Sequence, residues 1–462
     1  MNSNLKATVK TRHGLTREFI MEIGGRQGSK NTGRLFAKMM DHLAEILLSR
    51  AIGFPMTILI KVPVLLWVDD VITCVVGKTE QKAILQHIDQ FGKDHKLKWG
   101  QQKCQVMRVG KHVRNDSETW SIGNMQIQET VSYRYLGDVV TSDGKNTKNI
   151  DARKNKIMAS TISIKTIAAN ETLNMMETSV ILNLHDAVNL SALLTNSEAW
   201  NLNKGECEKI EQIEIQAIKL LFDLPSHIPT PALIHQFGLL YTKQRIEQKQ
   251  LIYLWKLMNK EENHWTRSAL LELIMRDIGW GKNIKTILSK YNLPSNLEEI
   301  KRLGRIVWTN RVKNVIENEN IKRLLQDCHK TVNGEEIIKT KTAFVVKKVK
   351  ETNYQRTPAA ELTKCNKKET KAIMIARFGM LECGKNFQGT RDLNCSQCNT
   401  VDDEAHRLNY CLKYDNMNFR NCDTKVDFAS FYSDDVNILK DLVRKISRVW
   451  NVKNANGTMI TE

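Results

Sequence analysis

Residues 64–76 of this chain read Val-Leu-Leu-Trp-Val-Asp-Asp-Val-Ile-Thr-Cys-Val-Val. Two apolar runs flank Asp69 and Asp70, which predicts two half-buried strands joined by a turn that carries both carboxylates. Other Asp-Asp pairs at 402–403 and 434–435 lie in polar surroundings, so the flanking runs carry the information rather than the dipeptide. Adjacent carboxylates on a rigid hairpin are suited to holding a divalent metal ion in a fixed place. The alternative is an ordinary polar turn, because aspartate is common in turns.

The segments on both sides of this hairpin predict a small α+β unit. Residues 18–23 read as a strand, and an amphipathic helix is expected after them. The apolar stripe of that helix comprises Leu35, Phe36, Met39, Met40, Leu43 and Leu47. A second helix, over residues 79–95, is expected to bury Ile84, Leu85, Ile88 and Phe91. Short strands near residues 105–109, 121–127 and 132–136 would complete the unit.

The remainder of the chain is predicted to be mostly helical. Residues 151–291 have an almost continuous helical pattern, broken by the proline-containing segment 225–231. Residues 339–371 hold ten Lys or Arg and three Glu, a local balance of 10 − 3 = +7. We expect this segment to be a solvated basic linker or an arm that binds phosphate.

The size and charge of the chain limit the classes of partner. With 462 residues and 41% hydrophobic composition, two to four domains are expected. The net charge of +18 and the pI near 9.3 favour a polyanion as partner, nucleic acid first and anionic membrane second. No apolar run reaches the roughly 18 residues that a membrane span requires.

The N-terminus lacks the apolar core of a signal peptide, so we expect an intracellular protein, in the nucleus or cytoplasm, that is not secreted. The ten cysteines are scattered along the chain. That distribution suits a reducing compartment and one metal site better than a disulfide framework.

An ordered series of motifs around the hairpin resembles the palm of a reverse transcriptase, specifically that of non-LTR (LINE-type) retrotransposons. The series begins at Arg26-Gln27-Gly28, where a Gln-Gly turn opens a helix, and continues with the aromatic-x-Asp-Asp box at 67–70. In the family the Gln-Gly turn lies under the templating base and the incoming nucleotide. The resemblance therefore implies that Arg26, Gln27 and Gly28 bind nucleotide and template, and glycine permits the close approach of backbone to nucleic acid.

The resemblance assigns the catalytic residues in the same way. It implies that Asp69 ligates catalytic magnesium, that Asp70 assists, and that Lys103 lies near the triphosphate. It also implies a hairpin that grips the primer end, formed by Tyr135, Leu136 and Gly137. Nucleotide transfer in such a site uses two divalent ions roughly 3.5 to 4 Å apart, and magnesium prefers hard oxygen ligands such as carboxylates.

One departure from the family pattern affects activity. The family carries a further aspartate on a strand well before the Gln-Gly turn, whereas residues 1–16 of this chain contain no acid. Without that carboxylate, the loss of transition-state stabilisation would be several kcal/mol. We expect an N-terminally truncated polymerase that is inactive or very weak alone.

A second constellation near the C-terminus predicts a structural zinc site. Cys395, Cys398, His406 and Cys411 supply three thiolates and one imidazole, a complete tetrahedral set. Zinc could contribute on the order of 10 kcal/mol to so small a unit, far more than a core of Leu408 and Tyr410. The set resembles the Cys-Cys-His-Cys knuckle of LINE-type polyproteins, and a chance cluster is the alternative.

A basic helical region lies between these two constellations. The cations around Trp308 are Lys301, Arg302, Arg305, Arg311 and Lys313. Such a mixture suits single-stranded nucleic acid, but a solvated helix face with Trp308 in the core is the favoured interpretation. The apolar residues of 198–225 resemble the family's helical thumb and are expected to be core.

Together these observations predict an α+β protein with a partial reverse-transcriptase palm, a mostly α-helical thumb and connection, and a zinc knuckle. The expected boundaries are 1–145 for the palm, 146–300 for the thumb and connection, 301–390 for a basic helical linker, 391–425 for the knuckle and 426–462 for a tail. The implied function is RNA-directed DNA synthesis with RNA template, DNA primer, Mg²⁺ and structural Zn²⁺, without a membrane. The alternatives are a nucleic-acid binding remnant and a helical scaffold with structural zinc.

Overall fold

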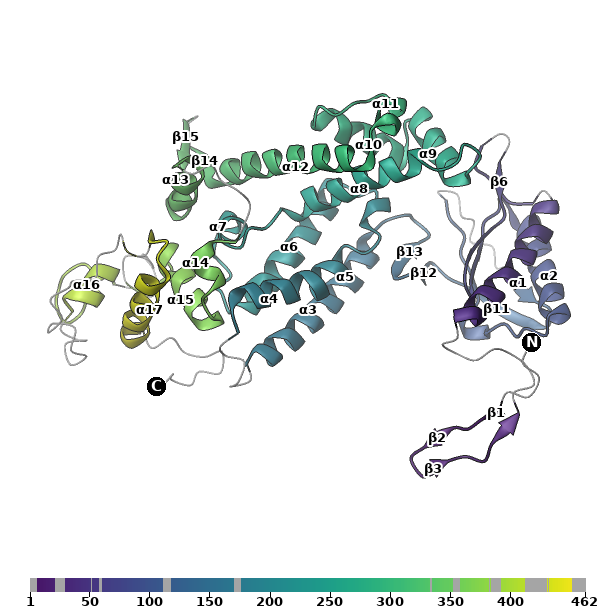
Figure 1. Ribbon diagram of the computed structural model, residues 1–462, viewed down its shortest axis with the longest axis horizontal. Helices are drawn as coiled ribbons and strands as arrows, with labels where there is room; N and C mark the ends of the chain where they lie inside the picture. The colour runs from purple at the N-terminus through teal and green to yellow at the C-terminus, as the bar shows by residue number, and fades with distance from the viewer. Residues whose placement is uncertain are drawn as a thin grey trace. The chain divides into compact units, whose positions relative to one another are not determined.

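The structure is a computed structural model that combines helices with small sheets, the α+β class that the sequence predicts (Figure 1). The chain divides into two compact units, Met1–Tyr133 with Asn263–Glu272 and Arg134–Glu262 with Leu273–Glu462. The residues that the structure describes are 6–20, 30–50, 52–57, 60–110, 118–169, 176–332, 335–351, 358–381, 383, 392–411, 430 and 432–450.

The first unit is built from short strands, all antiparallel in their pairing except the parallel pair β9 and β11, and from the helices α1 (Lys30–Ser49) and α2 (Lys78–Asp94). Its hairpins pair β1 with β4, β2 with β3, β5 with β6, and β7 with β8, while β9, β10 and β11 form one sheet. The bounds are β1 (Lys6–Ala7), β2 (Lys10–Thr11), β3 (Gly14–Leu15), β4 (Phe19–Ile20), β5 (Phe54–Pro55), β6 (Lys61–Val62), β7 (Val64–Trp67), β8 (Asp70–Thr73), η1 (Gln101–Lys103), β9 (Gln105–Val106), β10 (Trp120–Ile122) and β11 (Met125–Glu129).

The apolar stripes of α1 and α2 face one core, as their 3.6-residue spacing predicts. Its fully buried members include Met40, Leu43, Leu47, Ile84, Leu85, Ile88, Phe91 and Trp120. Leu35, which we expected in the stripe, is 53% exposed, whereas its neighbour Phe36 packs against the core. The two helices thus form the platform on which β7 and β8 pack.

The predicted strand over residues 121–127 is instead a hairpin. β10 and β11 are antiparallel, with Trp120 opposite Ile127, and the chain reverses between Ile122 and Met125. Gly123 takes a φ of 56°, which a glycine adopts without steric cost. The prediction of a single strand was therefore wrong at this turn.

The second unit is mostly helical. The β12–β13 hairpin crosses the boundary between the units, since β12 is Ser132–Tyr135 and β13 is Asp138–Thr141. The helices that follow along the chain are α3 (Thr147–Ala169), α4 (Thr178–Leu184), the π-helix η2 (His185–Leu190), α5 (Ser191–Leu193), η3 (Ser197–Ala199), α6 (Lys204–Leu221), α7 (Thr230–Gln236), α8 (Thr242–Met258), α9 (Trp265–Met275), α10 (Gly279–Lys290), α11 (Leu297–Arg302) and α12 (Arg305–Cys328). Of these, α9 belongs mostly to the first unit, which includes Asn263–Glu272. Among the described residues, no helix has the length and apolar character needed to cross a membrane.

For the described residues of 151–291, which exclude 170–175, the helical prediction is confirmed, including its break. α6 ends at Leu221 and α7 begins at Thr230, with Pro229 as its N-cap and Pro231 within its first turn. Trp308 of α12 is fully buried and its indole Nε1 donates to the Leu251 carbonyl at 2.9 Å. The favoured interpretation of Trp308 as a core residue is confirmed.

The segment 339–371, predicted to be a solvated basic linker or a phosphate-binding arm, forms helices over most of its described residues. After β14 (His329–Val332) and β15 (Glu335–Ile338), the chain forms η4 (Thr340–Thr342), α13 (Ala343–Glu351), α14 (Ala360–Thr363) and α15 (Lys367–Arg377). Val345, Val346, Leu362 and Cys365 are buried in the main core of the second unit. Lys347, Lys350, Lys364 and Lys368 are exposed, whereas Lys348 and Lys367 are half-buried and pair with Asp434 and Asp223.

The same core continues to the end of the described chain. Leu408 of α16 (Glu404–Asn409) and Leu439, Leu442 and Ile446 of α17 (Val436–Trp450) belong to it. Residues 436–450 are thus a packed helix where we expected a tail. Tyr410 is 51% exposed, so Leu408 is the apolar residue through which the cysteine-rich segment joins this core.

Candidate functional site

The acid-tipped hairpin has the geometry that the sequence predicts. β7 and β8 are antiparallel, with Trp67 opposite Asp70 and Val64 opposite Thr73. Leu66 and Val71 pack against the core of the first unit. The strands are therefore anchored on α1 and α2 by one face, and the turn extends beyond the anchored part.

Both carboxylates are exposed at the end of the hairpin. Trp67 is 63% exposed beside them. Val68, the first residue of the turn, has a φ of 55°, a conformation that a β-branched residue adopts only with strain. Strained backbone conformations persist only where the surrounding structure holds them, and they are found most often at functional sites.

Tyr133 lies near the hairpin and was not singled out by the sequence. Its hydroxyl donates to the Lys103 carbonyl at 2.9 Å, which fixes η1 to β12. Desolvation raises the pKa of Tyr133, and the negative charges of Asp70 and Cys104 raise it further. The structure therefore brings Asp70, Tyr133 and the Lys103 segment into one neighbourhood of the first unit, with the Lys103 side chain exposed.

Two other groups of residues were predicted to contact nucleic acid, and the structure describes one of them. Arg26, Gln27 and Gly28 lie outside the described residues. Tyr135, Leu136 and Gly137 belong to the second unit, where Leu136 and Gly137 turn the chain with φ of 45° and 91°.

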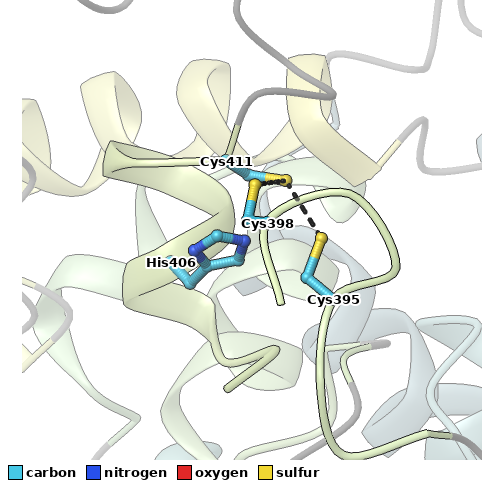
Figure 2. Close-up of side chains that lie close together, drawn as sticks. All are labelled: Cys395, Cys398, His406 and Cys411. Carbon is cyan, nitrogen blue, oxygen red and sulfur yellow. Dashed lines mark hydrogen bonds between the residues drawn. The ribbon is translucent and has the colours of Figure 1, made fainter. Parts of the chain in front are cut away.

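The predicted zinc ligands are gathered in one cluster (Figure 2). One ligand atom from each of Cys395, Cys398, His406 and Cys411 lies within 4.8 Å of the others. The Cys411 sulfur is 3.6 Å from that of Cys395 and 4.0 Å from that of Cys398. Zinc–sulfur bonds of about 2.3 Å in a tetrahedron place two thiolates roughly 3.8 Å apart. The sulfur spacing therefore fits one zinc ion.

The imidazole of His406 is oriented for the same ion. Its Nδ1 is 3.1 Å from the Thr400 hydroxyl, and its Nε2 is buried without a hydrogen-bond partner. A buried ring nitrogen left open while the other is bonded is the usual arrangement of a metal-binding histidine. The donor set and this open nitrogen both fit zinc.

Local hydrogen bonds build the cluster. Cys395 N–H donates to Thr400 O at 2.8 Å, which closes the turn that carries the first two cysteines. Asp403 caps α16 by accepting from the His406 N–H at 2.7 Å. Asp403 was not among the predicted residues, although an aspartate just before a helix is a recognisable N-cap signal.

The thiol of Cys395 is prepared for metal binding. Desolvation by itself raises its pKa, but hydrogen bonds from the Gln397 and Cys398 backbone, together with the adjoining His406 imidazole, outweigh that effect and lower the pKa to about 6. A thiolate is the form that binds metal. None of the cysteines that the structure describes is in a disulfide.

The two sites differ in how complete their ligand sets are. Within the described residues, the Cys/His cluster is the one group of three or more potential metal ligands. Asp69 and Asp70 offer hard oxygen atoms suited to magnesium, but no third acidic, histidine or cysteine side chain of the described chain groups with them.

Comparison with known proteins addresses the first of these sites. A search of curated proteins finds no match. A family model described as reverse transcriptase (RNA-dependent DNA polymerase) matches residues 3–140, a range that contains the acid-tipped hairpin and Lys103. The N-terminal part of the chain is therefore similar to the reverse transcriptase family.

Proposed function

We propose that this chain is part of the RNA-directed DNA polymerase of a non-LTR retrotransposon, with a palm remnant, a helical thumb and a zinc knuckle. The observation that carries the proposal is the acid-tipped hairpin of β7 and β8 inside the range of the reverse-transcriptase match. Template RNA and primer DNA would be its partners. The net charge of +18 supports a polyanionic partner.

In this proposal each residue near the hairpin has a distinct role. Asp69 would hold Mg²⁺, which stabilises charge on the attacking and leaving oxygens. Asp70 would assist, and the Lys103 ammonium would contact the triphosphate. Tyr133 would hold η1 in place through its bond to the Lys103 carbonyl. The exposure of both carboxylates supports access by a nucleotide.

We further propose that the chain alone is inactive or very weak in synthesis. The support is the ligand count, because no third acidic, histidine or cysteine side chain among the described residues groups with Asp69 and Asp70. A missing carboxylate at such a site costs several kcal/mol of transition-state stabilisation.

The Cys395–Cys411 cluster is proposed to be a structural zinc knuckle. All four tetrahedral positions are filled by side chains, so catalysis at this ion is not part of the proposal. A second candidate function, a nucleic-acid binding remnant, is favoured by the lysine-rich helices α13 and α15 that pack in the same core as the knuckle.

Two assays on the purified chain test the proposal. Binding to single-stranded RNA is expected at low salt and should weaken steeply as salt rises. Primer extension with Mg²⁺ should give trace synthesis that Asp69→Asn abolishes. The matched control is Asp41→Asn, an exposed acid of α1, which should leave the trace unchanged.

Each part of the proposal has an opposing outcome. Robust templated synthesis would overturn the proposed weakness, and trace synthesis that survives Asp69→Asn would remove Asp69 from the metal site. An absence of RNA binding at low salt would leave the helical scaffold with structural zinc as the better description.

A further inference from the structure

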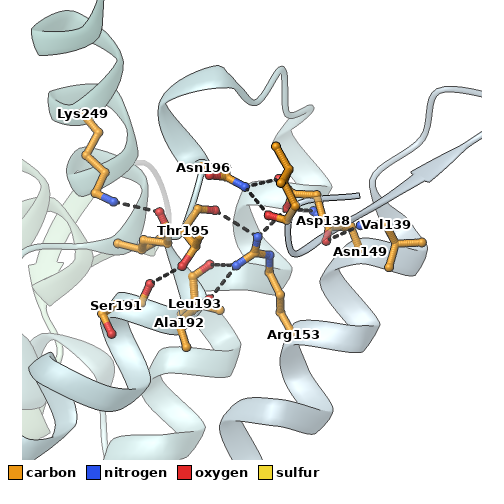
Figure 3. Close-up of polar contacts among 12 residues, drawn as sticks. Asp138, Val139, Asn149, Arg153, Ser191, Ala192, Leu193, Thr195, Asn196 and Lys249 are labelled. Carbon is orange, nitrogen blue, oxygen red and sulfur yellow. Dashed lines mark hydrogen bonds and ion pairs between the residues drawn. The ribbon is translucent and has the colours of Figure 1, made fainter. Parts of the chain in front are cut away.

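The turn at Leu136–Gly137 is held by the side chain of Asn196, from a distant segment of the second unit. Figure 3 shows Asn196 beside Asp138 and Arg153. The amide of Asn196 donates to the Leu136 carbonyl at 3.1 Å and to Asp138 Oδ2 at 2.9 Å. Asn196 itself has a φ of 61°, a left-handed conformation that asparagine tolerates better than most residues. One residue thus bonds both the turn and the first residue of β13.

Asp138 is the centre of this network. Its Oδ1 accepts from Asn149 Nδ2 at 3.0 Å and from Arg153 Nη2, both on α3. Asn149 also accepts the Val139 N–H at 3.1 Å through its own Oδ1. The start of β13 is therefore attached to the first turns of α3 by side-chain and backbone bonds.

Arg153 connects α3 to the segment that presents Asn196. Its guanidinium is 6% exposed and donates to the carbonyls of Ala192 at 2.5 Å and Thr195 at 2.9 Å. It also lies over the Trp200 ring at 4.7 Å. A buried arginine with carbonyl and carboxylate partners satisfies the open end of α5 and fixes the following loop.

A second helix holds the same loop from its other side. Lys249 of α8 donates to the Leu194 carbonyl at 2.8 Å, and Gln250 donates to the Trp200 carbonyl at 2.7 Å. The loop that carries Asn196 is thus tied to α3 and α8. The side chain of Leu136, in contrast, is 41% exposed.

This arrangement is more elaborate than the stability of a short hairpin requires. A buried ion pair is weak evidence for stability, and its best-supported use is to specify one conformation. Here the specified conformation is a turn of two residues with positive φ, Leu136 and Gly137, and the apolar side chain of Leu136 is exposed. A fixed turn of this kind suits contact with a ligand better than a free loop does.

We propose that Asn196, oriented by the buried Arg153, is a positioning residue that sets the Tyr135–Gly137 turn to receive the 3′ end of a primer strand. The inference rests on the proposed function, and it adds Arg153 and Asn196, the latter 60 positions from Leu136, neither of which any motif includes. Arg153 and Asn196 act through the turn and do not contact the strand themselves.

The test uses the full chain and a DNA primer annealed to RNA, with 2-aminopurine as the terminal base of the primer. Fluorescence anisotropy of a dye at the 5′ end reports total affinity, and 2-aminopurine emission reports the environment of the 3′ base. Asn196→Gly keeps the left-handed backbone and removes the amide. We expect its total affinity to stay within about twofold, because phosphate contacts dominate affinity. The 2-aminopurine emission of the bound primer should fall by about half or more, because the contacts that unstack the terminal base are lost.

Two further variants separate positioning from folding. Asn292→Gly is the matched control, since Asn292 is an exposed residue with a φ of 49° and should change neither signal. Asn196→Asp keeps the size and turns the amide donor into an acceptor that faces Asp138, so it should reproduce the loss. Thermal unfolding of each variant checks that it is folded.

The outcomes are distinguishable. An unchanged terminal signal in both Asn196 variants would overturn the inference, and so would an equal loss of affinity and terminal signal, which a merely structural role predicts. If the unchanged chain does not bind the duplex at low salt, the proposed function itself fails and the inference fails with it.

Discussion

Removal of zinc is expected to unfold residues 392–411 while the rest of the second unit stays folded. The segment contributes one fully buried apolar side chain, Leu408 at 2% exposure, to the core. Burial of one leucine is worth about 2 kcal/mol, whereas structural zinc contributes on the order of 10 kcal/mol. Without the ion, opening of the segment should therefore cost about 2 kcal/mol, which corresponds to an amide protection factor near 30.

Hydrogen exchange measured by mass spectrometry checks this difference. The amides of Cys395 and Cys411 are bonded within the segment at 2.8 Å, so both should exchange slowly in the zinc-loaded chain. A chelator should raise their exchange rates by more than about 1,000-fold, given the loss of several kcal/mol. Peptides of α3 and α6 should not change.

Metal content provides the matched comparison. Cys398→Ser should lose zinc, while Cys207→Ser, at a half-buried cysteine outside the cluster, should keep it. Unchanged protection of residues 392–411 after complete zinc removal would refute the reasoning, because it would mean that packing alone holds the segment.

Three other predictions concern stability. Trp308→Phe should lower the free energy of unfolding by about 2 kcal/mol, measured in urea, because it shrinks a fully buried side chain and leaves the Leu251 carbonyl without its indole donor. Val68→Asn should raise the stability of the first unit by about 1 kcal/mol in a thermal unfolding assay, because asparagine tolerates a φ of 55° better than valine. Burial, aided by the charge of Arg245, lowers the pKa of His185 to about 4. Since this pKa lies below the unfolded value, the unfolded chain binds more protons, and stability present above pH 6.5 should fall by about 2.5 kcal/mol at pH 4.5. In urea titrations at pH 6.5 and pH 4.5, His185→Asn should remove this part of the loss of stability. An unaltered pH dependence of stability would contradict the role given to His185.

The parts of the fold set by local periodicity could be predicted from the sequence. The β7–β8 hairpin and the stripe Met40, Leu43 and Leu47 follow from spacings of two and 3.6 residues. The hairpin at Gly123 carried a readable signal as well, because Gly-Asn between apolar runs is a typical two-residue loop. The apolar alternation on both sides of this loop predicts one continuous strand, and it was the stronger pattern.

The fold of residues 339–371 could not be predicted from charge. Val345, Val346 and Leu362 are few among the lysines, and their burial depends on partners such as Phe378 and Leu439 that come later in the chain. Tertiary contacts of this kind decide whether a basic segment is an arm or a helix, and no local pattern contains them.

The network around Arg153 could not be predicted for a different reason. Its acceptors at Ala192, Leu193 and Thr195 are backbone carbonyls, which every residue has, so the sequence does not mark them. An arginine in a helix is usually solvated. Arg153 is a buried donor because the end of α5 packs beside α3 and offers its carbonyls to the guanidinium.

The packing of the C-terminal elements changes what the basic segment can do. Lys348 of α13 bonds Asp434 at 2.7 Å, and the ring of Tyr432 lies 5.0 Å from that of Phe344, so α13 is attached to the segment that leads into α17. α17 shares its core with Leu408 of the zinc segment. Cations on packed helices lose less conformational freedom on binding than cations on an arm, which favours tighter contact with a phosphate backbone for the same charge. The proposed nucleic-acid contact therefore depends on helices that the main core holds in place, and the zinc segment joins that core through Leu408.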